Sequence, residues 1–153
     1  AAKLRAAGVE DFTITAGGQV YAGGTRGDRP WRIGIRDPRG AWDDYFGIVS
    51  LSDTSISTSG DYERFFVKDG VRYHHILDPK TGQPARKLRS VTIISPDATL
   101  ADALSTALMV MGKTSGMALV SRLNNVEAVL VDNAGEVHMS PGVDFTLVHQ
   151  PIR

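Results

Sequence analysis

The sequence predicts an α+β domain with a mainly antiparallel sheet and a few packed helices. Short segments that alternate apolar and polar residues follow one another through most of the chain, separated by glycine-containing turns typical of hairpins. Only residues 98–112 show a strong helical pattern, so strands outnumber helices. Of the 153 residues, 42% are hydrophobic and 22% charged, which is the composition of an ordinary globular domain.

The first element is predicted to be the end of a helix, residues 1–7, which Gly8 terminates. Period-two alternation then predicts the strands, and each is bounded by turn residues such as Gly17-Gly18 or Asp69-Gly70. In chain order these predicted strands are residues 12–15, 20–22, 31–35, 45–51, 65–67, 71–73, 90–94, 126–131 and 137–139. The Ser/Thr tract 52–59 fits a linker, but its lone apolar residue and flanking strands favour an ordered strand or loop.

The helix at residues 98–112 is predicted to present one apolar face and to end at Gly112. Its apolar residues recur at helical spacing and are Leu104, Ala107, Leu108 and Met111. A second helix is expected at about residues 114–123. Residues 78–89, which contain two prolines and a glycine, are expected to form a loop.

Composition excludes several classes of function. Lys plus Arg and Asp plus Glu both number 17, so the chain lacks the basic excess of a typical nucleic-acid-binding protein, and no nucleic-acid partner is expected. Cysteine is absent, which excludes disulfides, thiolate metal sites and a cysteine nucleophile. No apolar run reaches the roughly 18 residues needed to span a bilayer.

The helix at 98–112 supplies a candidate metal site. Asp102, Ser105 and Thr106 stand at positions i, i+3 and i+4, so they are expected to share one face, opposite the apolar one. A carboxylate beside two hydroxyls offers the hard oxygen ligands that Mg²⁺ prefers. An acidic residue in a first turn and a solvated hydroxyl face are also ordinary features of a helix.

A second candidate lies in the segment from Tyr73 to Gly82. A histidine can act as a general base near neutral pH. In an extended segment, His74 and His75 point to opposite faces, so at most one of them is expected to face a given site. Asp78 and Pro79 also begin an ordinary turn, and a lone surface histidine is common.

A third candidate is the run from Ser57 to Tyr62, where hydroxyls and a glycine could approach a phosphate through backbone N–H groups. The same residues could simply form a turn. No P-loop pattern is present, and Gly17-Gly18 lacks the spacing of a dinucleotide fingerprint. No pair of histidines has zinc-ligand spacing, because His138 and His149 are isolated in the sequence.

Taken together, blocks in this order resemble the ApbE-type flavin transferases, which are FAD:protein FMN transferases. Each block alone is weakly specific, but their order along nearly the whole chain is hard to obtain by chance. The blocks are Ala16-Gly17-Gly18, Trp31–Pro38, Ser59–Arg64, Tyr73–Gly82, Ala101–Ala107 and Ser140-Pro141-Gly142.

The resemblance implies a reaction in which FMN moves from FAD to a Thr or Ser hydroxyl of an acceptor protein, with Mg²⁺, releasing AMP. It implies that Asp102, Ser105 and Thr106 bind the metal. It implies that His75 assists the acceptor hydroxyl as the catalytic residue. The flavin nucleotide is then expected to contact residues of two blocks, namely His75, Ile76, Asp78, Ser59 and Gly60.

Family members are about twice as long as this chain, so residues 1–153 are expected to be the C-terminal portion of a flavin transferase domain. The partners implied are FAD, an acceptor protein and the N-terminal half, which carries much of the FAD pocket. The resemblance also implies a periplasmic protein or a lipoprotein anchored to the inner membrane. Two alternatives stay open, a metal-dependent FAD pyrophosphatase that uses water as acceptor and a non-catalytic flavin-binding module.

Overall fold

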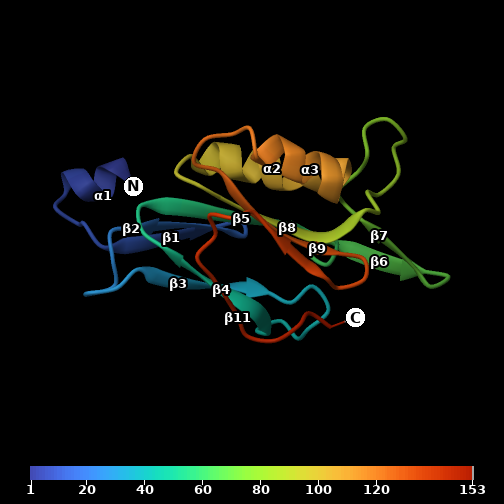
Figure 1. Cartoon of the computed structure of the whole chain (residues 1–153), viewed down its shortest axis with the longest axis horizontal. Helices are drawn as coiled ribbons and strands as arrows, with labels where there is room; N and C mark the ends of the chain where they lie inside the picture. Colours follow the sequence, from blue (N-terminus) through green and yellow to red (C-terminus); the bar gives the residue numbers. More distant parts are fainter. Residues whose placement is uncertain (153) are drawn as a thin grey trace.

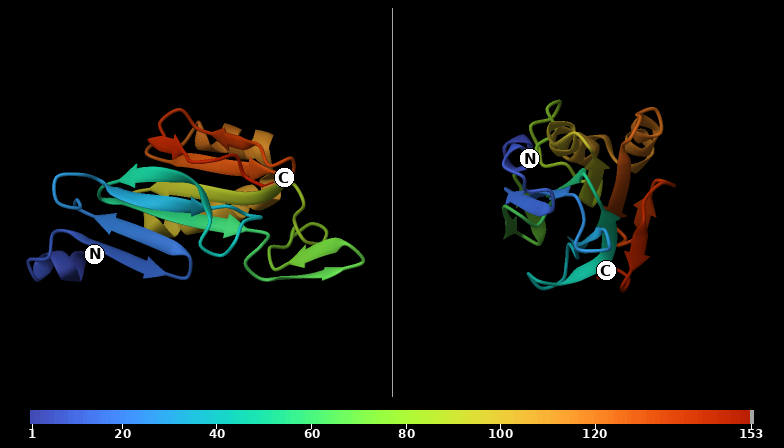
Figure 2. Two further views of the ribbon diagram at one scale, coloured as in Figure 1. Left: turned by 90° about the horizontal axis from the view of Figure 1, so that it is seen from below. Right: turned by 90° about the vertical axis from the view of Figure 1, so that its left-hand side faces the viewer.

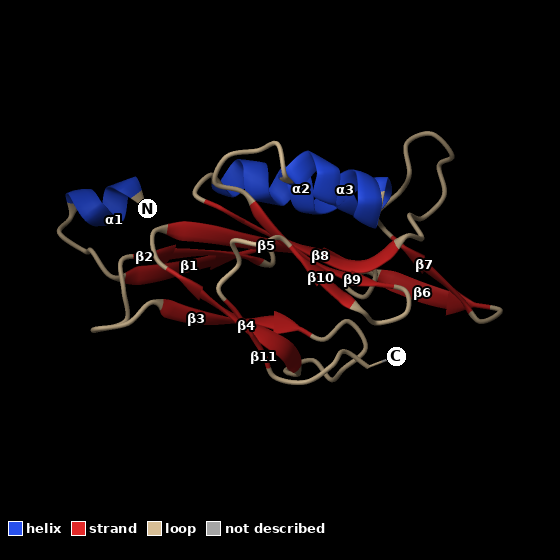
Figure 3. Ribbon diagram, in the orientation of Figure 1, coloured by secondary structure: helices blue, strands red, loops and turns tan. Residues whose placement is uncertain are grey.

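The computed structural model describes residues 1–152. Two sheets are stacked, and two helices cover the outer face of the larger sheet (Figures 1 and 3). The helices are α1 (Ala2–Ala6), α2 (Ala98–Met111) and α3 (Lys113–Val120). The strands are β1 (Phe12–Ala16), β2 (Gln19–Gly23), β3 (Trp31–Arg36), β4 (Tyr45–Leu51), β5 (Thr54–Gly60), β6 (Phe65–Lys68), β7 (Val71–His74), β8 (Leu88–Ser95), β9 (Glu127–Asp132), β10 (Val137–Met139) and β11 (Phe145–Leu147).

The larger sheet has the strand order β1-β2-β5-β8-β9-β10, and each neighbouring pair is antiparallel. The predicted α+β class with a mainly antiparallel sheet is therefore confirmed. Gly17 and Gly18 join β1 to β2 with positive φ angles of 59° and 87°, as a tight hairpin turn requires. The Ser/Thr tract forms β5, next to the centre of this sheet, rather than a linker.

Helices α2 and α3 pack on one face of the larger sheet, and the smaller sheet β11-β4-β3 packs on the other. Strand β9 needs the helices on one face and the smaller sheet on the other, because its alternating residues are buried on both faces. Ala128 and Leu130 contact the helical layer, whereas Val129 and Val131 contact the core shared with β3 and β4. The central strands are thus excluded from water on both faces, which fixes their register.

Helix α2 begins at Asp97, whose carboxylate accepts hydrogen bonds from the backbone N–H groups of Thr99 and Leu100. It ends at Gly112, which has a φ of 82°. The apolar face includes Leu104 and Leu108 as predicted. Met109 is fully buried, whereas Met111 and Ala107 are only partly so, since the helix turns its buried side toward β5 and β8.

Strands β6 and β7 form a separate two-stranded sheet that projects from the body of the molecule, at the end opposite α1 (Figure 2, left). Asp69 and Gly70 make its turn with φ angles of 52° and 74°, so the predicted hairpin is confirmed. Every residue of β6 is exposed.

Several helix and strand boundaries in the structure differ from those that the sequence patterns predicted. Strand β8 begins at Leu88, inside the segment predicted as a loop, because pairing with β9 extends it through a register shift. Helix α3 ends at Val120 rather than at residue 123. Strand β11 was not predicted at all, since three residues carry little periodic signal and its pairing with β4 is decided by tertiary contact.

Candidate active site

Strand β5 and helix α2 bring the polar candidates together, although more than 40 residues separate them in sequence. Alternation along β5 turns Ser57 and Ser59 toward α2. The Ser57 hydroxyl donates to Oδ1 of Asp102 at 3.3 Å. The Ser59 hydroxyl shares hydrogen bonds with those of Ser105 at 2.8 Å and Thr106 at 3.1 Å. This network holds the side chains of the helix against the strand.

Asp102 and Thr106 are exposed on one side of α2, as the spacing predicted, but Ser105 is not. Ser105 is fully buried, and its hydroxyl donates to the backbone carbonyl of Asp102 at 2.8 Å. Its position lies at the border between the solvated and apolar faces, and the packing of α2 on β5 covers it. Ser105 therefore holds Ser59 and the backbone of Asp102 in place and is not exposed beside Asp102 and Thr106.

A cavity of about 590 Å³ opens over Asp102 and Thr106. Pockets for small organic ligands usually measure about 300–1,000 Å³. Besides those two residues it is lined by Gly17, Gly18, Gly34, Arg36, Thr58, Ser59, Gly60, Tyr62, Glu63, Arg64 and His75. The structure thus gathers members of all three candidate sequence segments around one hollow.

His75 follows the end of β7, and its backbone N–H donates to the carbonyl of Arg64 at 3.1 Å. Its side chain is exposed and lines the cavity, whereas His74 is 7% exposed and lies on the other side. The Nε2 atom of His74 hydrogen-bonds to the carbonyl of Ala85 at 2.7 Å. The expected division between the two histidines is confirmed, with His74 holding the following loop and His75 free to meet a ligand.

Two of the predicted flavin contacts do not line this cavity. Ile76 is buried in the core beneath the helices. Asp78 accepts the backbone N–H of Lys80 at 2.9 Å, and its own N–H donates to the carbonyl of Gln83 at 2.8 Å. These bonds make Asp78 part of an ordinary turn, as the sequence suggested, whereas direct contact of Ile76 or Asp78 with a nucleotide stays a prediction.

Arginine side chains supply positive charge that the residue-by-residue sequence argument missed. Arg36, from β3, lies with its guanidinium carbon 4.9 Å from the ring centre of Tyr62. Its Nη1 forms an ion pair with Oε1 of Glu63 at 3.8 Å. Its Nε is buried and has no hydrogen-bond partner among the residues that the structure describes. Burial raises the pKa of Tyr62, so its phenol stays neutral. In the sequence, the one feature that could have indicated this role was the place of Arg36 as a polar residue at the end of an alternating strand.

Gly60 lets the chain pass closely beneath an aromatic ring. A Cβ atom at this position would lie 2.3 Å from the ring of Tyr62, which excludes any other residue without rearrangement. The next residue, Asp61, is 7% exposed and accepts hydrogen bonds from both terminal nitrogens of Arg39 at 2.7 Å. This bidentate pair raises the pKa of Arg39 and fixes the wall of the cavity at Gly60.

The histidines that are isolated in sequence gain carboxylate neighbours in the fold. His138 lies 2.7 Å from Asp132, and His149 lies 3.2 Å from Asp44. Each histidine, with its neighbouring acids, forms a cluster whose ligand atoms all lie within 4.8 Å of one another. The ammonium group of Lys113 stands 3.2 Å from His138 Nε2 and already supplies a cation there.

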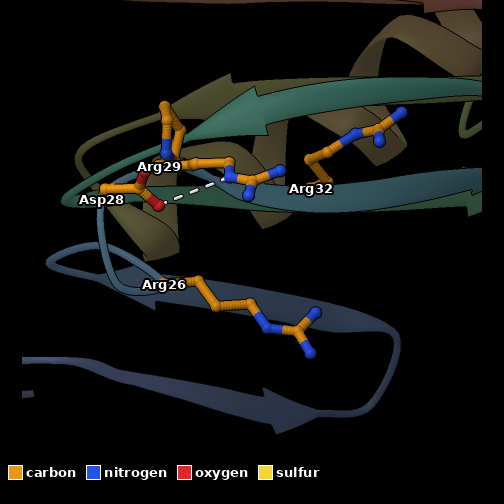
Figure 4. Close-up of a pocket in the computed structure, with 5 residues that line it drawn as sticks. Arg26, Asp28, Arg29 and Arg32 are labelled. Carbon is orange, nitrogen blue, oxygen red and sulfur yellow. Dashed lines mark hydrogen bonds and ion pairs between the residues drawn. The ribbon is translucent and has the colours of Figure 1, made fainter.

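A further hollow of about 340 Å³ lies beside the loop between β2 and β3 (Figure 4). Arg29 extends beside Asp28, 3.4 Å from its carboxylate, while Arg26 lies across the hollow and Arg32 at its end. None of the predicted site residues lines it. The candidate chemistry is therefore concentrated in the cavity between β5, α2 and His75.

Comparison with known proteins agrees with this geometry. The profile of the ApbE family matches residues 1–130. The chain belongs to the ApbE family. The matched range contains every residue that lines the cavity over Asp102 and Thr106.

Curated relatives of this ApbE chain include FAD:protein FMN transferases from Treponema pallidum and Rhodobacter capsulatus. The first is 41% identical over 150 residues, which are 92% of this chain and 41% of the relative. The second is 41% identical over 142 residues, which are 92% of this chain and 27% of the relative. The chain therefore spans less than half the length of these relatives.

Solved structures agree as well. The ApbE protein of Thermotoga maritima superposes with a TM-score of 0.76 at 47% identity, covering 85% of this chain and 42% of that one. The flavin transferase ApbE of Vibrio cholerae gives 0.75 at 34% identity, covering 92% and 45%. Within residues 1–152, no helix has the length and apolar character needed to cross a bilayer.

Proposed function

We propose that this chain forms the metal-binding and acceptor-activating side of an enzyme that transfers FMN from FAD to a protein. The acceptor is a Thr or Ser hydroxyl, the metal is Mg²⁺ and the other product is AMP. One observation carries the proposal: the carboxylate of Asp102, the hydroxyl of Thr106 and the ring of His75 line one cavity of suitable size. The relatives named as FAD:protein FMN transferases support the same reaction.

The donor set around Asp102 fits Mg²⁺. The carboxylate of Asp102 and the hydroxyl of Thr106 are exposed to the cavity from adjacent turns of α2, and both are hard oxygen donors. These two residues would hold the ion, with Ser105 contributing through Ser59 and the helix backbone. A bound Mg²⁺ would offset the negative charge of the diphosphate.

The remaining residues account for attack by an alcohol on a diphosphate. The acceptor oxygen forms a bond to the FMN phosphorus, the bond from that phosphorus to the bridging oxygen breaks, and AMP leaves with that oxygen. His75 accepts the proton of the attacking hydroxyl, since it is the exposed imidazole at the cavity. Arg36 and Arg64 add positive charge where the diphosphate would lie.

An open cavity with one wall would leave much of the surface of FAD exposed to water. The curated relatives are more than twice as long as the region that matches this chain. We therefore propose that the nucleotide is held jointly by this chain and by the N-terminal half found in the relatives. A periplasmic or lipoprotein location stays a prediction from the family resemblance.

The test mixes the full-length protein with FAD, MgCl₂ and acceptor proteins, then measures FMN adducts by mass spectrometry and AMP by chromatography. A metal-dependent adduct on Thr or Ser with one AMP per adduct is the expected result. Free FMN and AMP without adduct would instead identify an FAD pyrophosphatase. Binding of FAD with neither product would identify a flavin-binding module.

A further inference from the structure

A second, apolar hollow of about 520 Å³ adjoins the active-site cavity. The two hollows share Arg64 and His75 in their walls, so His75 stands at the junction between them. The other residues around the apolar hollow are Phe65, Phe66, Tyr73, His74, Leu77, Gly82, Gln83 and Pro84. A molecule lying in it would contact His75 and Arg64, whereas Asp102 lines only the neighbouring cavity.

The hairpin that forms this hollow carries unusually exposed apolar side chains. Phe66 is 61% exposed and Val67 58%, and in the loop after β7 Leu77 is 52% exposed. Phe66 stacks on Tyr73 with ring centres 5.2 Å apart, which makes a flat apolar platform. Within residues 1–152, β6 and β7 pair only with each other, so each also has an unpaired backbone edge that can receive an extended segment.

The hairpin and the loop that follows it are rich in basic residues, although the whole chain is neutral. Residues 64–87 contain two acidic side chains, Asp69 and Asp78, against the basic residues Arg64, Lys68, Arg72, Lys80, Arg86 and Lys87. The guanidinium carbon of Arg86 lies 5.4 Å from the ring centre of Tyr73, and Lys68 lies two residues after Phe66 on the same face of β6. This surface complements a segment that carries carboxylates beside large apolar side chains.

The direction of the proposed reaction decides which molecule occupies the hollow. In a displacement at phosphorus, the attacking and leaving oxygens lie roughly in line. If His75 takes the proton of the attacking hydroxyl, the acceptor arrives from the side of His75 and the leaving nucleotide lies on the other side. The hollow beyond His75 is therefore on the path of the acceptor.

We propose that the β6–β7 hairpin is the docking surface for the acceptor polypeptide. This inference rests on the proposed transferase function and names the partner's chemistry. The acceptor is an extended segment with at least one large apolar residue on the Phe66–Tyr73 platform and carboxylates beside Lys68 and Arg86. The projection of the hairpin from the body leaves room for a folded acceptor around that segment (Figure 2).

The first experiment separates acceptor docking from flavin binding. Phe66→Ser and Lys68→Glu are made in the full-length protein, with Leu147→Ser as the matched control, because Leu147 is 45% exposed and lies on β11 in the smaller sheet. We expect each hairpin variant to raise KM for the acceptor by roughly tenfold, which corresponds to about 1.4 kcal/mol. The Kd for FAD should change less than about twofold, and the control should match the wild type in both. A parallel loss of FAD affinity would assign the hollow to the flavin and overturn the proposal.

The second experiment identifies the preferred sequence with a randomised nonapeptide library that has a fixed central Thr. Adducts are sequenced by mass spectrometry. We expect enrichment of Asp or Glu and of one large apolar residue, and Lys68→Glu should weaken the acidic enrichment. Adducts with no preference in the wild type would overturn docking while leaving transfer intact. No adduct with the wild type on peptides or proteins would contradict the transferase proposal itself, and docking with it.

Discussion

The β5–α2 wall of the candidate active site and the β6–β7 hairpin both border His75 but are built in opposite ways. The wall is packed between sheet and helices, and its polar groups bond to one another through Ser57, Ser59 and Ser105. The hairpin is a two-stranded ribbon whose apolar residues face solvent. The proposed metal site needs fixed ligands, whereas the proposed docking surface needs accessible backbone edges.

His75 and Arg64 line both hollows, so the rigid wall and the exposed hairpin both border the proposed catalytic residue. Changes in the wall should therefore alter catalysis or stability, and changes in the hairpin should alter recognition of the acceptor. Each of the following measurements tests that division.

The largest effect is expected from Asp102→Ala in the full-length protein. It removes the only carboxylate among the residues predicted to hold Mg²⁺, so metal-dependent AMP release should be abolished. Thr106→Ala should be milder, because a hydroxyl is a weaker ligand than a carboxylate. AMP release is measured against MgCl₂ concentration, and an unchanged metal dependence in Asp102→Ala would defeat the assignment.

His75→Ala should slow transfer by roughly 10²–10⁴-fold, the usual effect of losing a general base. The affinity for FAD should change much less. His74→Ala is the matched comparison, because the buried ring of His74 hydrogen-bonds to the carbonyl of Ala85. This variant should lower the free energy of unfolding more than the rate of transfer. Single-turnover transfer and FAD titration would be compared, and equal losses in both for His75→Ala would show a binding role instead.

Stability should also separate the two regions. Leu108 is fully buried between α2 and the larger sheet, so Leu108→Ala should lower the free energy of unfolding by about 2–5 kcal/mol. Phe66→Ala removes a side chain that is 61% exposed and should cost less than about 1 kcal/mol. Urea unfolding followed by circular dichroism measures both. Comparable losses would mean that the hairpin is part of the core rather than a docking surface.

The smallest effect concerns acid stability of the packed body. Burial raises the pKa of Asp132, but hydrogen bonds from His138 and two backbone N–H groups outweigh it and lower the pKa from 3.8 to about 2. Because the folded value is the lower one, the ionised carboxylate stabilises the fold above about pH 4. This contribution is lost as pH falls toward 2. Asp132→Asn should therefore flatten the decline in unfolding free energy over that range, and a decline as steep as in the wild type would exclude this role.

Local patterns in the sequence determined the hairpins, the long helix and the fold class. Turn pairs such as Gly17-Gly18 and Asp69-Gly70 adopt the positive φ angles that tight hairpin turns need. Leu104 and Leu108 recur at helical spacing and mark the apolar face of the long helix. Neighbouring residues therefore suffice to predict these elements. The resemblance of ordered blocks also indicated the family, which the family match confirmed. The metal, base and nucleotide roles of the individual residues stay predictions.

Only the tertiary structure decided which side chains share a surface. The three residues predicted to bind metal stand within five positions of one another, yet packing of α2 on β5 buries Ser105 and leaves Asp102 and Thr106 open. Arg36 reaches the cavity from β3, and β11 exists through its pairing with β4. These outcomes depend on contacts between residues far apart in the chain, and no local spacing encodes where two distant surfaces will meet.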